Sequence, residues 1–388
     1  MIELQVIPHE PLVVANFTWS DRPDNLGTKS IELQELYLSN RDSEPLYFQE
    51  TILELVNLIK SNQLLPLDQT SNILGLAFST VNLIEIYLIF SQPEITEMYC
   101  NKIGNRIVIS HLKYGRCLTN LEFTPVFWEA LRIRVEYDSG IALEPNKPAL
   151  KIGLQSPLGN LRISIQDKPL SPNGPVFSIR RLPHTPITMT ELVSQNQITK
   201  SKADYLVKLL QNRANIVIAG EPGSGKTTLA NALLLETLPF WRLIVMEDAR
   251  EVQINPEKFP MVVHYALPTV GEDDRYHKRS EEIARLLHRS PDYVFLGELQ
   301  TKDDTEVAFE GFAAGIRGMA TTHATNISGL LMRWTYSHKL PKDLIQSINC
   351  IAMTEREFVE NNVKLTISDI YIQNVKQDQN VWEVVEFD

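Results

Sequence analysis

The chain has 388 residues, of which 43% are hydrophobic and 22% charged, and a formal net charge of -11. This length favours two or three domains, and the composition excludes collagen-like, disulfide-dense and wholly disordered proteins. The acidic balance disfavours general binding to nucleic acid or to an anionic bilayer, because both require basic surfaces.

The N-terminal stretch MIELQVIPHEPL does not resemble a signal peptide, because Glu3 and Pro8 interrupt the apolar run that such a segment needs. Residues 72–90 form the most membrane-like stretch, but Glu85 and several polar residues interrupt it. We therefore expect a buried helix and strand there rather than a membrane span. The three cysteines lack CxxC spacing, which supports neither a disulfide framework nor a four-cysteine zinc site. A reducing, cytoplasmic location fits best.

The first half of the chain predicts two regions and a connector. Residues 1–60 carry no motif and end in a helix-like stretch, YFQETILELVNLIKSN, so we treat them as an N-terminal extension of unknown role. Residues 61–182 contain alternating stretches such as NRIVISHLKYG and GNLRISIQ, which predict a smaller α+β domain with a half-exposed sheet. Residues 183–190 lie within RRLPHTPITMTELV, whose prolines and threonines are typical of a semi-rigid linker.

The remainder, residues 191–388, predicts an α/β domain. Apolar strands alternate with helix-like segments, a pattern typical of a largely parallel sheet covered by helices. The predicted strands are NIVIAG, RLIVMEDA, DYVFLGEL and GMATTHA.

One loop in this domain predicts nucleotide binding. The stretch IVIAGEPGSGKTTLANALL, residues 216–234, contains G-x-x-x-x-G-K-[ST] between an apolar strand and a helix former. In such a loop, backbone N–H groups and the helix N-terminus face phosphates, lysine adds a positive charge, and threonine offers a hydroxyl to Mg²⁺. A merely structural turn would need a glycine but not the Lys-Thr pair. The predicted nucleotide-binding residues are Gly220, Glu221, Pro222, Gly223, Ser224, Gly225, Lys226, Thr227 and Thr228.

Acidic residues follow two of the predicted strands. Glu247 and Asp248 end RLIVMEDA, and Glu298 lies at the end of DYVFLGEL. In open α/β sheets such strand ends line the ligand crevice, so these three acids and the Thr227 hydroxyl are the predicted metal ligands. His323 follows a short strand and is a candidate to sense or polarise the γ-phosphate, the alternative being a structural histidine.

The ordered set GEPGSGKTT, VMEDARE, SPDYVFLGEL and ATTHATN resembles the Walker A, Asp box, Walker B and His box of the secretion and type IV pilus ATPase superfamily. Upstream, QPEITEMYCN, ISHLKYGRCLTNLEF and PVFSIRRLPHTPITMTELV resemble the N-terminal domain and linker of its archaeal branch, which drives archaella, adhesive pili and related filaments. The likeness runs from about residue 93 to the C-terminal residue and does not cover residues 1–60.

The resemblance implies a RecA-like P-loop ATPase domain, a hexameric ring, and an N-terminal domain that moves against the ring as nucleotide turns over. It implies catalytic roles for Glu247, Glu298 and His323, and leaves open which glutamate is the base. Arg162 and Arg180 match arginines of the family's N-terminal domain that reach the phosphates, although surface or salt-bridged arginines are the alternative. It also implies ATP and Mg²⁺ as cofactors and an integral membrane platform protein as partner. No nucleic acid is expected, and the implied location is cytoplasmic, at the inner face of the membrane.

The chain departs from the superfamily pattern at several positions. The family's glycine and arginine are usually one residue closer than Gly159 and Arg162, and Gln300 and Ile316 stand where an arginine and a histidine are usual. The favoured prediction is a Mg²⁺-dependent ATPase motor that powers assembly or retraction of a pilus-like filament, or secretion across the cytoplasmic membrane. The alternatives are a nucleic-acid translocase on a RecA-like core and, in view of the departures, a non-hydrolysing regulatory subunit.

Overall fold

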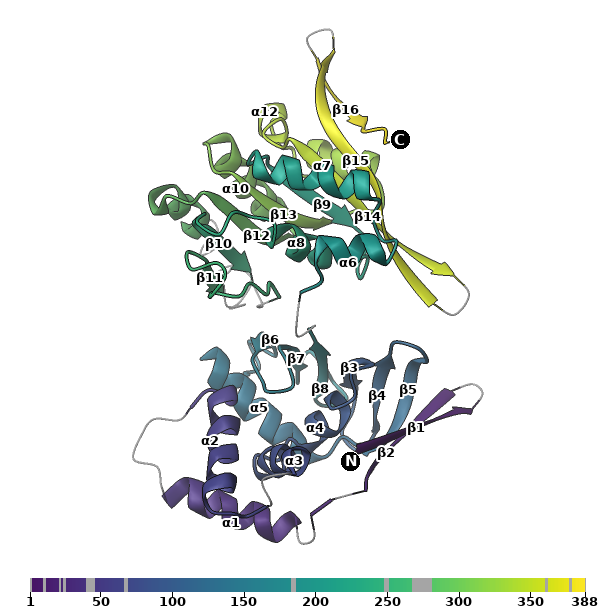
Figure 1. The fold of residues 1–388 in the computed structure, drawn as a ribbon, viewed down its shortest axis with the longest axis vertical. Coiled ribbons are helices and arrows are strands. Elements are labelled where there is room, and N and C mark those ends of the chain that lie inside the picture. The colour runs from purple at the N-terminus through teal and green to yellow at the C-terminus, as the bar shows by residue number, and fades with distance from the viewer. Residues whose placement is uncertain are drawn as a thin grey trace. The chain divides into compact units, whose positions relative to one another are not determined.

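The chain divides into two compact units, Met1–His184 and Thr185–Asp388 (Figure 1). The division falls inside residues 183–190, where the sequence predicts a linker. None of the described helices is long and apolar enough to cross a membrane. The computed structural model describes residues 2–9, 12–20, 22–23, 26–39, 46–65, 69–182, 186–247, 251–266, 281–359, 362–376 and 379–387.

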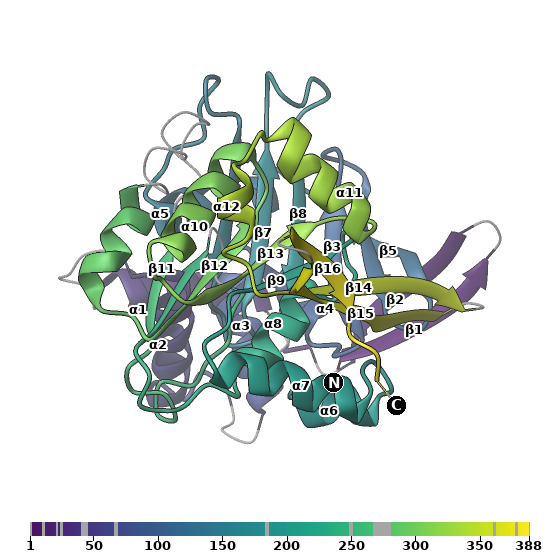
Figure 2. The ribbon, with the colours of Figure 1, turned by 90° about the horizontal axis from the view of Figure 1, so that it is seen from above.

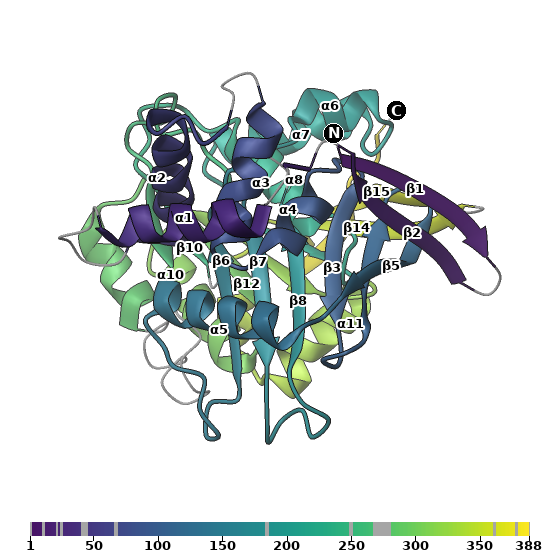
Figure 3. The ribbon, with the colours of Figure 1, turned by 90° about the horizontal axis from the view of Figure 1, so that it is seen from below.

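The first unit is built on a mostly antiparallel sheet, in which only β2 and β5 form a parallel pair among the described strands. The strand order is β1-β2-β5-β4-β3-β8-β7-β6. The helices of this unit lie together on one side of the sheet (Figure 3). The strands are β1 (Ile2–His9), β2 (Leu12–Trp19), β3 (Ile95–Cys100), β4 (Arg106–His111), β5 (Gly115–Glu122), β6 (Ala149–Leu154), β7 (Leu161–Gln166) and β8 (Val176–Arg181), and the helices are α1 (Leu26–Ser39), α2 (Phe48–Ser61), α3 (Thr70–Thr80), α4 (Ile84–Phe90) and α5 (Pro125–Ser139).

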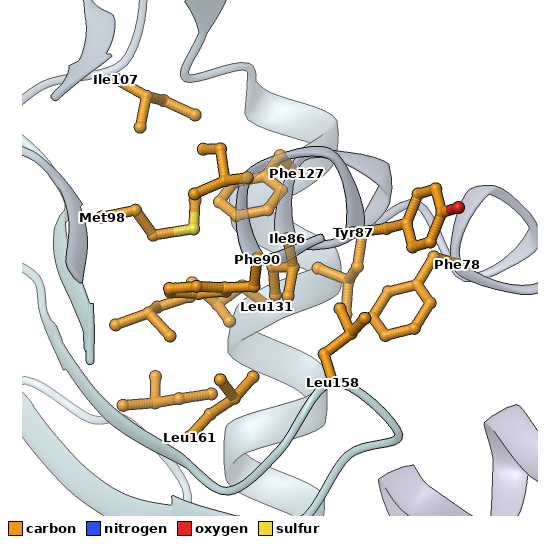
Figure 4. Packing of buried hydrophobic residues seen from close by; sticks show 14 of the residues in the cluster. Phe78, Ile86, Tyr87, Phe90, Met98, Ile107, Phe127, Leu131, Leu158 and Leu161 are labelled. Carbon is orange, nitrogen blue, oxygen red and sulfur yellow. The ribbon is translucent and has the colours of Figure 1, made fainter. Parts of the chain in front are cut away.

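The core of the first unit lies between this sheet and its helices. Burial alternates along β7, so that Leu161 and Ile163 are buried while Arg162 between them is half-exposed. Figure 4 shows Leu161 near Phe90 and other side chains from the helices. Each such side chain contributes about 1.5–3 kcal/mol when fully buried. The opposite face of the sheet is therefore polar and accessible, as the alternating sequence predicts.

The described residues of the range 1–60 contribute to this core. The indole N–H of Trp19 on β2 donates to Asn72 Oδ1 on α3 at 3.1 Å, and its ring lies 5.8 Å from that of Tyr87 on α4. Gly75 leaves room for this indole, because a methyl group there would overlap the Trp19 ring. The segment that the sequence suggested as an extension thus shares one sheet and one core with residues 61–182. The predicted helix at its end is confirmed as α2.

The expectation of a helix and a strand over residues 72–90 is wrong in part, because both segments are helical. The two helices, α3 and α4, are joined by a turn in which Asn82 has φ 58°. Ile73, Leu76 and Ala77 are buried at helical spacing against the rest of the core. Tertiary burial of this face outweighs the strand preference of the β-branched residues.

Glu85, near the start of α4, makes the first unit sensitive to pH. Burial raises the pKa of this carboxyl from its ordinary value of 4.5 to about 7. The folded chain then binds more protons than the unfolded chain between these two values, so stability falls as pH rises through that window. At pH 8 we expect Glu85→Gln to increase the unfolding free energy of the first unit by up to about 3 kcal/mol, because the amide carries no charge. The melting temperature should rise accordingly.

The test is calorimetric melting of both proteins at pH 4.5 and pH 8. At pH 4.5 the carboxyl is protonated in the folded chain, so Glu85→Gln should change little. Glu32→Gln, on an exposed position of α1, is the matched control. An equal stabilisation by Glu85→Gln at both pH values would contradict the assignment to burial of the charge.

The second unit is built on a sheet whose first six strands in spatial order are parallel and whose last two are antiparallel additions. The order is β11-β10-β12-β13-β9-β14-β15-β16. The strands are β9 (Ile216–Gly220), β10 (Leu243–Glu247), β11 (Val263–Ala266), β12 (Tyr293–Leu299), β13 (Gly318–His323), β14 (Cys350–Val359), β15 (Asn362–Lys376) and β16 (Gln379–Val384). The helices of this unit include α6 (Met189–Ser194), α7 (Lys200–Gln211), α8 (Lys226–Leu234), α10 (Lys302–Ala313), α11 (Ile327–Met332) and α12 (Lys342–Ile345).

Helices cover both faces of this second sheet. Helices α6, α7 and α8 pack on one face and α10, α11 and α12 on the other (Figure 2). Every residue of β9 and of β10 is buried, which explains why both read as continuous apolar runs. The α/β fold class predicted from the sequence is confirmed, and the carboxyl ends of the parallel strands form one edge of the sheet.

Candidate active site

The glycine-rich loop joins β9 to α8, as the sequence predicts. Gly223 and Gly225 have φ of 75° and 88°, a region in which side chains are strained. A methyl group on Gly220 would overlap the hydroxyl and carbonyl of Thr354 on β14. The Ser224 and Thr354 hydroxyls lie 2.6 Å apart, which ties the loop to this strand. The loop is therefore held in one conformation by its glycines and by β14.

Lys226, the first residue of α8, is 7% exposed and directs its ammonium group back over the loop. It donates to the carbonyl oxygens of Gly220 at 3.1 Å and Glu221 at 2.8 Å, and lies 3.0 Å from His323 Nδ1. Burial lowers the pKa of Lys226, and the charges of Glu298 and Glu251 oppose that shift. The lysine is thus desolvated at the place where the motif predicts a phosphate.

His323 connects this lysine to Glu298. Its Nε2 lies 2.5 Å from Glu298 Oε1. Because an ammonium group has no lone pair to offer, Nδ1 of His323 must accept from Lys226. The ring proton is then on Nε2, which donates to the carboxylate. Gln300 Nε2 donates to the second oxygen of Glu298 at 2.7 Å, so the residue that replaces the family's usual arginine orients the acid.

The sheet register explains how these residues meet. His323 at the end of β13 is the register partner of Gly220 on β9, and Glu298 on β12 is the partner of Thr321 on β13. Three parallel strands thus deliver the loop, the histidine and the acid to the same edge. The sequence-predicted residues Lys226, His323 and Glu298 are brought together.

Glu247, the other candidate acid, has a different environment. Its carboxylate is buried, with its side chain 7% exposed, and accepts the backbone N–H groups of Glu251 at 3.0 Å and Val252 at 3.2 Å. His264 Nδ1 on β11 lies 4.0 Å from Glu247 Oε1. The Val252 N–H also lies 3.3 Å from Glu247 Oε1, so both oxygens of Glu247 accept from the backbone at Glu251 and Val252. Asp248 lies outside the described residues.

The described residues contain some of the predicted metal ligands, but these do not form a complete metal site made by protein side chains alone. Within the described ranges, no three His, Cys, Asp or Glu side chains are grouped as an all-protein metal site. Mg²⁺ is commonly held by one or two protein oxygens together with phosphates and water. Thr227, the second residue of α8, and Glu298 offer the hard oxygen ligands that such a site needs.

Arg162 and Arg180 lie side by side in the first unit. They are register partners on β7 and β8, and Glu97 on β3 is the partner of Arg180 on the other side. Arg180 is exposed and Arg162 half-exposed, on the polar face of the sheet. The structure therefore pairs the two arginines with each other, whereas the loop residues belong to the second unit.

Sequence reasoning missed the residues that link β12 and β13 next to the site. Arg333 Nη2 donates to Thr322 Oγ1 at 2.9 Å, and that hydroxyl donates to the carbonyl of Leu299 at 2.9 Å. These contacts join β12 and β13 directly behind Glu298 and His323. Arg333 opens a short π-helical turn, Arg333–Ser337, a feature often found near functional sites. Nothing in the local sequence pattern marks this turn.

The loop, the histidine and the acid thus lie at one edge of the second sheet. The profile of the family described as Type II/IV secretion system protein matches residues 129–380. The chain belongs to this family. The superfamily resemblance read from the four motifs is thereby confirmed.

Characterised and uncharacterised relatives agree with this membership. An uncharacterized protein of Methanocaldococcus jannaschii is 32% identical over 42% of this chain, which spans only 29% of that protein. The conjugal transfer protein TrbB of Rhizobium radiobacter is 26% identical over 75% of this chain and 89% of its own length. The type IV secretion system protein PtlH of Bordetella pertussis is 30% identical over 42% of this chain and 47% of its own.

Solved structures share the fold. The ATPase DotB of Legionella pneumophila aligns with a TM-score of 0.52 at 12% identity, over 85% of this chain and 82% of that one. The pilus retraction motor PilT with bound ADP aligns with a TM-score of 0.50 at 15% identity, over 70% of this chain and 79% of that one. The two-domain arrangement with a RecA-like second domain, expected from the sequence, is therefore the fold of this chain.

Proposed function

We propose that this protein is a Mg²⁺-dependent ATPase motor that works as a homohexameric ring at the inner face of the cytoplasmic membrane. Its role is to power assembly or retraction of a pilus-like filament, or secretion, through an integral membrane platform protein. Family membership supports the general class. The observation that carries the ATPase assignment is the connected set Lys226, His323 and Glu298 above a P-loop at the carboxyl edge of a parallel sheet.

The residues of this set divide the chemistry between them. Backbone N–H groups of the loop and the N-terminus of α8 face the phosphates, and the desolvated Lys226 adds a positive charge. Binding requires this lysine to exchange one of its three partners for a phosphate oxygen. Thr227 would hold Mg²⁺ together with phosphate oxygens and water, and Mg²⁺ would supply charge neutralisation at the phosphates.

Glu298 is the better placed general base. Its side chain is 26% exposed, so water reaches it, whereas the buried Glu247 carboxylate is occupied by backbone N–H groups. An acid that accepts a proton from water must lie within hydrogen-bond reach of that water. Protonated Glu298 can return its proton through solvent, with His323 holding the carboxylate in position.

Arg162 and Arg180 fit a role in the ring rather than in an isolated chain. The two side chains are register neighbours on the polar face of the first sheet, and Glu97 is the cross-strand partner of Arg180 on the other side. Guanidinium groups suit planar, bidentate contacts to phosphate. We assign them to the γ-phosphate side of a nucleotide, so that motion of the first unit follows nucleotide turnover.

The test is phosphate release from Mg·ATP over a series of protein concentrations, with mass measured by light scattering on the same samples. The motor function predicts specific activity that rises as a hexamer forms. ATP binding by a silent monomer would support the regulatory alternative instead. Strong stimulation by DNA would favour the translocase alternative, which the acidic composition disfavours.

A further inference from the structure

The loop strand β9 has two neighbours, and they differ in chemistry. On one side β13 places His323 in register with Gly220, and Glu298 follows on the next strand. On the other side β14 places Thr354 in register with the same glycine. The reacting groups described above therefore all lie on the β13 side of the loop. The β14 side has no role in that chemistry.

The hairpin of β14 and β15 contacts the loop closely on this second side. Nη1 of Arg356 lies 3.5 Å from the place where a Cβ on Gly223 would be. The Leu365 side chain lies 3.3 Å from the corresponding place on Gly225. Arg356 and Leu365 are register partners on the two strands, so they lie on one face of the hairpin. An exposed arginine and a half-buried leucine thus border the tip of the loop.

A nucleotide held by this loop extends from it in two directions, with the terminal phosphate on one side and the nucleoside on the other. If the terminal phosphate meets Glu298 and His323, the nucleoside leaves toward β14, where Arg356 and Leu365 lie. We propose that these two residues form the nucleoside subsite, with the Arg356 guanidinium plane against the base and ribose and Leu365 as the apolar contact. This inference rests on the proposed function.

The chemistry of the two side chains suits a nucleoside. A guanidinium group is planar, weakly hydrated and stacks on aromatic faces, whereas an ammonium group acts as a point charge. Arg356 is exposed and its guanidinium group lies beside the loop. The subsite therefore discriminates between ligands with and without a base, while Lys226 and the loop bind the phosphates of both.

The experiment is calorimetric titration of the full chain with Mg·ATP and with magnesium tripolyphosphate, which has the phosphates but no nucleoside. We expect Arg356→Ala to weaken ATP binding about tenfold and to leave tripolyphosphate binding within about twofold. Arg356→Lys keeps the charge but not the plane, and should bind ATP nearly as weakly as Arg356→Ala. Arg317→Ala is the matched control, because Arg317 is exposed before the amino end of β13, at the opposite edge of the sheet.

Three results would overturn the subsite. Unchanged ATP affinity in Arg356→Ala would remove Arg356 from the site. An equal loss for ATP and tripolyphosphate, restored by Arg356→Lys, would make Arg356 a phosphate ligand instead. A wild-type chain that binds tripolyphosphate and ATP equally well would show that no nucleoside subsite exists. If the wild-type protein binds neither ligand, the proposed function itself is overturned. That result differs from all three results above, in which the wild-type protein still binds ATP.

Discussion

Lys226→Ala should reduce the affinity of the chain for Mg·ATP by about a hundredfold or more. The ammonium group is buried and directs its hydrogen bonds over the loop where the phosphates are expected. A charge-assisted hydrogen bond contributes about 1.5–3 kcal/mol, and about 2.7 kcal/mol corresponds to a hundredfold change in affinity. Calorimetric titration measures the loss directly, with tripolyphosphate as a second ligand that should be affected equally.

The folded state should tolerate this change. Removing Lys226 also removes the cost of burying its charge, which lowers the pKa of the group in the folded chain. The carbonyl of Gly220 keeps a second donor, the backbone N–H of Ala324 at 3.2 Å. Lys200→Ala, in an exposed ion pair with Asp204 on α7, is the matched control. Unchanged ATP affinity in Lys226→Ala, with normal melting, would remove the phosphate-binding role from this loop.

The parts of the fold that the sequence predicts are those encoded by neighbouring residues. The loop spacing, the buried strand β9 and the alternation along β7 each follow from a pattern within one short segment. His323 and Glu298 could be proposed for the same reason, because each ends a recognisable strand. Their direct contact follows from the strand order, which places β13 between β9 and β12.

The parts that the sequence does not predict depend on contacts between distant segments. Ser224 and Thr354 meet although they lie 130 residues apart, and Trp19 reaches Asn72 across 53 residues. No local pattern indicates either contact, so the hairpin beside the loop and the place of residues 1–60 were both missed. The capping of Glu251 by Glu247 is equally hidden, since the strand ending only shows that the acid is at the sheet edge.

Two acids at one sheet edge therefore have separable functions, which substitution by glutamine should show. Glu298→Gln should bind Mg·ATP within severalfold of the wild type but hydrolyse it about 10²- to 10⁴-fold more slowly, because the amide cannot accept a proton from water. Its melting temperature should change little, because the side chain is partly exposed and glutamine can still accept from His323. Single-turnover phosphate release, measured beside ATP titration, separates hydrolysis from binding.

Glu247→Gln is the matched variant, with the same chemical change at the buried acid. Here we expect a loss of about 1–3 kcal/mol in unfolding free energy, because one of the carboxylate oxygens that accept the Glu251 and Val252 N–H groups becomes a donor. Any loss of turnover should then accompany the loss of stability. Normal turnover in Glu298→Gln, together with a fully stable but inactive Glu247→Gln, would transfer the role of general base to Glu247. The environments of the two carboxylates predict the opposite, since only Glu298 is both accessible to water and joined through His323 to the lysine of the loop.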